Sequence, residues 1–183
     1  MGYEMKLQEP LDFYSVTDHG FFMGMLNAWS DTTTDISQKD FAKPFHDLNR
    51  IENLTTESAG PRSALFSEIL GGTVTQTYSD LSPNVLKAWL TKNTQAALKS
   101  FDYKIHKSAW EDVARAANEH NDPGHFTTFI GYEFTTSTNI EGGNLHRNVI
   151  FNSSKAPIRP WTRIDSINPE DLWTWQDKLR DKG

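Results

Sequence analysis

The sequence predicts an α/β fold with strands near residues 11–18, 126–135 and 145–151 and several helices. Two observations lead to this fold class. The three segments are rich in aromatic and β-branched residues, which favour strands. The stretches between them contain helix-capping residues followed by apolar residues at helical spacing. Because the order is strand, helices, strand, strand, helix, we expect an α/β layout with an antiparallel hairpin within 126–151.

The first predicted strand, residues 11–18, is apolar with few interruptions. Such a pattern is typical of a strand that is covered on both faces. The strand stops at Asp18 and His19. In α/β folds, polar residues at the carboxyl ends of core strands lie where ligands bind. Asp18 and His19 are therefore candidate site residues.

A long polar region follows the first strand. Residues 20–29 are expected to form a short helix or a loop with a face of Met and Phe. Residues 30–60 are rich in Thr, Asp, Ser and Asn, and we interpret them as an excursion with one helix near 41–49. Segments this long are often functional in compact domains, so 30–60 is a candidate lid.

Helix signals then follow in order. A helix is expected over 61–70, with Pro61 in its first turn, and another from the Ser82-Pro83 cap to about residue 99. The next start signal is a capping box formed by Ser108 and Glu111. A buried stripe at helical spacing follows this box and consists of Trp110, Val113, Ala114 and Ala117.

The last elements are two strands and a helix. The Asn121–Gly124 stretch breaks the preceding helix, and residues 126–135 form a strand by composition. Gly142-Gly143 turns the chain into the strand at 145–151. Asn168-Pro169 opens the final helix, which ends in basic residues.

Composition excludes several function classes. The 183 residues suffice for one domain with a core. A formal net charge of -6 and the absence of a basic run argue against a nucleic acid or an anionic membrane as partner. There is no Cys, which excludes disulfides and thiolate chemistry but leaves the compartment unknown. The chain shows neither a signal peptide nor a run of eighteen apolar residues.

Three polar residues interrupt the three most apolar strands. They are His19, Glu133 and His146. A buried carboxylate such as Glu133 is costly unless a cation, a network of donors or a metal balances it. Two imidazoles and one carboxylate from three strands would make a nitrogen and oxygen metal site.

Structural alternatives remain open for each of these residues. Either histidine could be a core residue that is bonded to a backbone carbonyl. Glu133 could form a buried ion pair with Arg147, and Asp18 could cap the turn that follows it.

Four stretches of the sequence resemble the polymerase and histidinol phosphatase (PHP) superfamily, and within it a bacterial family of unknown function, domain of unknown function 3604. The stretches are EPLDFYSVTDHGFFMG, SAWEDVARAANEHNDPGHFTTFIGYEF, GGNLHRNVIF and PEDLWTWQDKLRDKG. They keep their order and cover most of the chain. FTTFIGYEF followed by NLHRNVIF is the most specific match.

The resemblance implies a distorted β/α barrel with a cluster of divalent metals, such as Zn, Mn or Fe, at the carboxyl ends of its strands. It implies that His19, Glu133 and His146 ligate metal and that Asp18 supports them. It gives Arg147 no ligand role, and we interpret Arg147 as an anion contact. Asp18 and Arg147 are thus the catalytic candidates.

The sequence also departs from the superfamily pattern. The upstream His-x-His strand and the later ligand motifs are missing from it. We therefore interpret residues 1–183 as a single partial barrel domain that is truncated at both ends, with incomplete metal coordination and no activity in isolation. Exposed sheet edges would then favour pairing with a second copy.

The predicted function is metal-dependent hydrolysis, directed at a small phosphorylated or anionic substrate through activated water. Two other classes stay open. One is a non-catalytic ligand-binding module on the same fold, and the other is a structural or interaction domain.

Overall fold

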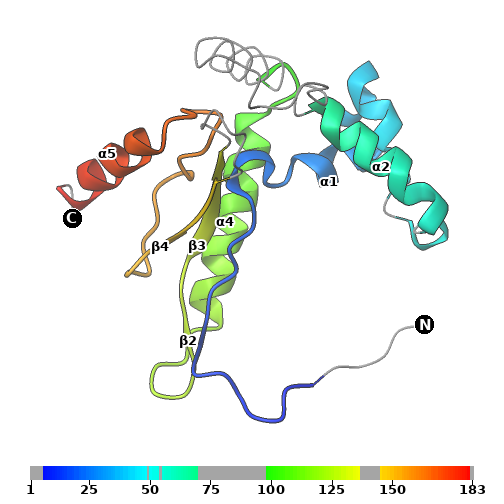
Figure 1. Cartoon of the computed structure of the whole chain (residues 1–183). Helices are drawn as coiled ribbons and strands as arrows, with labels where there is room; N and C mark the ends of the chain where they lie inside the picture. Colours follow the sequence, from blue (N-terminus) through cyan, green and yellow to red (C-terminus); the bar gives the residue numbers. More distant parts are fainter. Residues whose placement is uncertain (1–5, 49, 54, 70–97, 137–144, 182–183) are drawn as a thin grey trace.

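The computed structural model describes residues 6–48, 50–53, 55–69, 98–136 and 145–181. These residues form a mixed α/β protein in which two short sheets lie beside the long helix α4, Tyr103–Glu119 (Figure 1). The predicted α/β class is confirmed. Within the described residues, the two sheets do not close into a barrel.

The strands are shorter than the sequence predicts. Their bounds are Phe13–Tyr14 for β1, Thr127–Thr128 for β2, Gly131–Thr136 for β3 and Leu145–Ile150 for β4. β1 is parallel to β2, and β3 is antiparallel to β4. The hairpin expected within 126–151 is thereby confirmed.

The segment that contains β1 continues beyond the assigned strand. It runs beside the chain from β2 to β3, because the carbonyl oxygen of Asp18 accepts the N–H of Glu133 at 2.8 Å. A parallel bridge joins His19 to Glu133. The segment 12–19, β3 and β4 therefore lie side by side, with β3 in the middle.

The first strand is not covered on both faces, as the sequence analysis expected. The side chains of Phe13 and Val16 are 66% and 46% exposed. Their apolar character suggested a central strand, but within the described residues this segment is hydrogen-bonded only along the side that faces 127–133. The segment is an exposed edge, so its side chains are less buried than its apolar composition predicted.

The remaining elements are helical. The α-helices are α1, Met25–Ser30; α2, Thr56–Ile69; α4, Tyr103–Glu119; and α5, Pro169–Arg180. The 3-10 helices are η1, Gly20–Phe22; η2, Ile36–Gln38; η3, Asp40–Phe45; and η4, Ile51–Asn53. In Figure 1, α2 and α5 lie on opposite sides of the strands.

Two apolar clusters hold these elements together. The first packs Trp29 of α1 against Phe45 of η3, so part of the polar region 30–60 has its own core. The second lies between α4, β3 and α5 and includes Trp110, Tyr132 and Leu172. The apolar stripe predicted for α4 faces the second cluster: Trp110 is buried in it, and Val113, Ala114 and Ala117 are half-buried and pack against it.

Two helices begin earlier than expected. α4 starts at Tyr103, because the Asp102 side chain accepts the N–H groups of Lys104 at 2.7 Å and Ile105 at 3.2 Å. Ser108, the expected cap, lies exposed inside this helix. An acidic side chain at the N-cap satisfies two otherwise unpaired donors, and this earlier cap takes precedence.

α2 begins at Thr56, so Pro61 lies inside the helix and not in its first turn. Thr55 and Ser58 form a reciprocal cap, in which each hydroxyl accepts the backbone N–H of the other residue. This pair satisfies donors of the first turn in the way a capping box does.

Most of the other predicted helices are present in the fold. The helix near 20–29 is confirmed by η1 and α1, the helix near 41–49 corresponds to η3, and the final helix is confirmed by α5. The helix expected from residue 83 and the turn at 142–143 fall outside the described residues. Among the described residues, no helix is both long enough and apolar enough to cross a membrane.

Candidate metal centre

Three neighbouring chain segments bring His19, Glu133 and His146 together. His19 stands at the end of the edge segment, directly beside Glu133 of β3. On the other side of β3, His146 of β4 is paired in register with Thr135. Because side chains alternate along a strand, Glu133 and Thr135 share one face of β3. That face carries the site.

The carboxylate of Glu133 lies between the two imidazoles. Its Oε2 atom is 2.5 Å from Nδ1 of His19, and its Oε1 atom is 2.9 Å from Nδ1 of His146. The two imidazole ring centres are 5.5 Å apart. One donor atom from each residue falls within 4.8 Å of the others. The convergence inferred from the sequence therefore exists in the fold.

The donor set fits a divalent metal ion. Two nitrogen ligands and one carboxylate, converging from different strands, form the kind of set that holds zinc or iron while leaving coordination positions open. The Glu133 side chain is 19% exposed, whereas those of His19 and His146 are 50% and 42% exposed. The open side of the cluster therefore faces solvent, from which an ion and a substrate can reach it.

Thr135 is a site residue that the sequence analysis missed. Its hydroxyl oxygen lies 2.7 Å from Nδ1 of His19 and 3.3 Å from Nδ1 of His146. Thr135 is almost completely buried. It fixes both rings beside Glu133, as residues that surround metal ligands commonly do. The signal was available, since Thr135 lies two positions after Glu133 and must share its face.

The two other predicted site residues are placed differently. Asp18 lies next to His19 and contributes its backbone carbonyl to the Glu133 N–H, while the residue itself is exposed. Arg147 pairs in register with Phe134, on the face opposite Glu133. The structure thus does not bring Arg147 to the cluster, and its contact with an anion stays a prediction.

The alternative pairing of Glu133 with Arg147 does not occur among the ion pairs of the described residues. The four remaining histidines lie outside the cluster. His46 contacts the carbonyl of Ser37, and His120 contacts that of Ala116 at the end of α4. His125 pairs with Asp122 on the surface.

The fold and the cluster define a mixed α/β protein with a candidate three-residue metal centre. The chain belongs to the family described as "Protein of unknown function (DUF3604)", which matches residues 1–183. No curated protein and no solved structure matches it.

Proposed function

We propose that this chain carries the metal centre of a metal-dependent hydrolase of the PHP superfamily, directed at phosphate esters. The convergence of His19, Glu133 and His146 on one solvent-facing edge carries the proposal. The resemblance of the surrounding motifs to that superfamily supports the reaction class and a barrel-type fold. The substrate proposed is a small phosphorylated or otherwise anionic molecule.

Each residue has a distinct part in this proposal. Glu133 would supply a carboxylate oxygen, and His19 and His146 would each supply an imidazole nitrogen to a divalent ion such as Zn, Mn or Fe. Thr135 holds the two rings at the carboxylate. A divalent ion held there would lower the pKa of a bound water and balance charge on the leaving oxygen.

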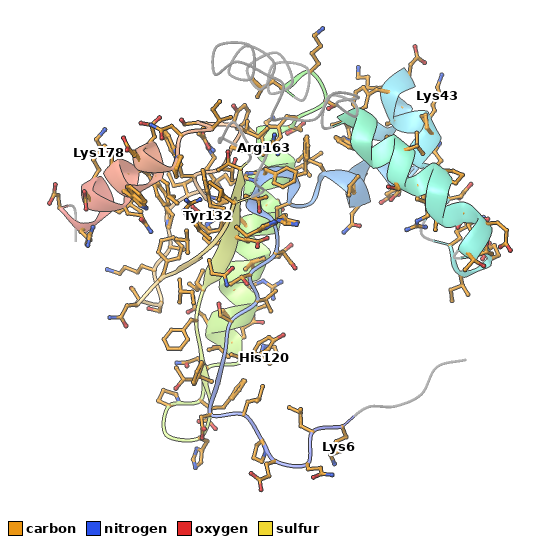
Figure 2. All side chains as sticks on the ribbon, in the orientation of Figure 1. Lys6, Lys43, His120, Tyr132, Arg163 and Lys178 are labelled. Carbon is orange, nitrogen blue, oxygen red and sulfur yellow. The ribbon has the colours of Figure 1, made fainter. Side chains whose placement is uncertain are left out.

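The first test is metal retention. Purified chain is loaded with Mn or Zn, dialysed, and subjected to elemental analysis beside the H19A/H146A double variant and E133A. We expect the parent chain to retain metal and both variants to lose it, because each variant removes donor atoms from a set of three. His120→Ala is the matched control, since His120 is exposed at the far end of α4 (Figure 2).

Full metal occupancy in the double variant would contradict the ligand assignment. Retention in the parent chain leads to the second test, in which the metal-loaded chain is assayed for metal-dependent hydrolysis of phosphate monoesters and diesters. Turnover that requires the added metal supports the hydrolase. A metal-loaded protein that binds inorganic phosphate but cleaves no ester would instead favour a ligand-binding module.

A further inference from the structure

The turn that follows His19 is anchored by a buried histidine of α4. The Nε2 atom of His106 lies 2.5 Å from the carbonyl oxygen of Gly20, and the His106 side chain is fully buried. A carbonyl oxygen only accepts hydrogen bonds, so the ring nitrogen must be the donor. This bond links α4 to the residue next to a candidate metal ligand.

Gly20 also packs closely against other residues of the fold. A Cβ atom added at Gly20 would lie 2.7 Å from the ring of Tyr132 and 3.2 Å from the methyl group of Thr162. The Tyr132 ring is itself held, since its hydroxyl donates to the carbonyl of Trp161 at 2.7 Å. Figure 2 shows Tyr132, a residue of β3, in the crowded interior. The backbone at Gly20 is therefore in close contact with both Tyr132 and His106.

The choice of histidine at position 106 is informative. Its other ring nitrogen, Nδ1, is buried and makes no hydrogen bond within the described part of the chain. Leaving a buried polar atom unpaired is costly, and an apolar side chain would fill the same space without that cost. The bond from Nε2 to Gly20 is the polar contact that can offset this cost.

We propose that His106 is a positioning residue for the candidate metal centre. Its Nε2–H group anchors the turn that begins directly after His19, and so determines where the His19 imidazole meets Glu133. This inference rests on the proposed function, because it names what holds one of the three ligands in place.

The test compares the affinity for Mn or Zn of the parent chain with that of H106L, H106Q and W110F. H106L removes the donor, and we expect affinity to fall about tenfold, as it does for residues that orient metal ligands. In H106Q the side-chain amide can replace the donor, so affinity should largely recover. Trp110→Phe is the matched control, because it removes a bond of the same kind from the next turn of α4 to Pro157.

A second pair of variants tests the inference even if H106L does not fold. Gly20→Ala places a methyl group against the Tyr132 ring and should also weaken metal binding. Gly60→Ala adds the same group where no atom lies within 4 Å, so it should have no effect on the site. Parent-like metal affinity in H106L or G20A, or an equal loss in the matched control, would overturn the inference.

A metal-free measurement separates this inference from the proposed function. The imidazole resonances of His19, identified by their loss in H19A, report on its contacts with Glu133 and Thr135. We expect H106L to shift them more than W110F does. If the parent chain binds no metal, the proposed function fails, while the spectra still decide whether His106 positions His19. Identical His19 resonances in H106L and W110F would reject that role.

Discussion

At the scale of single residues, the candidate centre depends on how Glu133 is surrounded. The sequence indicated a carboxylate inside an apolar strand, and in the described part of the chain it pairs with two imidazoles and with no arginine. The identities of His19, Glu133 and His146 were predictable because burying a polar side chain in an apolar strand costs free energy unless a partner or a ligand compensates for it. Thr135 could have been found from its position two residues after Glu133, whereas the contact between His106 and Gly20 joins residues that are far apart in sequence.

His106 also makes a pH dependence predictable. Burial lowers the pKa of His106, the bond to the Gly20 carbonyl opposes this shift, and the nearby Arg159 and Asp165 act in opposite directions. An unfolded histidine titrates near ~6.5. Below that pH the unfolded chain binds more protons at this residue than the folded chain, so the free energy of unfolding should decrease as the pH falls.

The measurement is chemical denaturation of the parent chain and H106Q at a series of pH values from neutral to mildly acidic. Glutamine does not titrate, so the decrease in unfolding free energy should be smaller in H106Q. An identical pH dependence in the two proteins would show that His106 contributes nothing to it.

At the scale of elements, helix positions were predicted better than helix starts. The apolar spacing in α4 predicted both the helix and the face that packs, because a helix that packs against β3 needs a continuous row of apolar residues. The start of α4 was predicted too late in the chain. The sequence analysis placed the cap at Ser108, whereas in the fold the Asp102 side chain accepts the N–H groups of Lys104 and Ile105 at the start of the helix.

A pair of substitutions tests this assignment. Asp102→Ala should lower the free energy of unfolding by about 1 kcal/mol, because two N–H groups at the start of α4 lose their acceptor. Ser108→Ala is the matched control and should change it by less than about 0.5 kcal/mol, since Ser108 is exposed within the helix. Thermal or chemical denaturation followed by circular dichroism measures both. A larger loss in S108A than in D102A would contradict the observed start.

At the scale of the whole molecule, the segment 12–19 leaves one edge of the strand layer open within the described residues. Phe13 and Tyr14 are 66% and 50% exposed there. An exposed apolar edge readily pairs with another chain. We therefore expect purified chain to self-associate in a concentration-dependent manner.

Phe13→Lys should reduce this association, because a charged edge residue disfavours strand pairing. Ile51→Lys is the matched control, since Ile51 is an exposed apolar residue of η4 and belongs to no strand. Light scattering after size-exclusion chromatography measures the mass of each protein. An unchanged mass distribution in F13K, or an equal reduction in I51K, would show that the edge is not the contact.

The sequence by itself determined the α/β class, the hairpin, the buried stripe of α4 and the three residues of the candidate metal centre. These depend on local composition and on the cost of placing polar groups in apolar strands. Only the tertiary structure decided that 12–19 is an exposed edge, that Arg147 lies on the face opposite Glu133, that Thr135 contacts both imidazoles, and that His106 contacts the Gly20 carbonyl. Each of these depends on which strands are neighbours and on strand register, and both are set by contacts between residues that are distant in the chain.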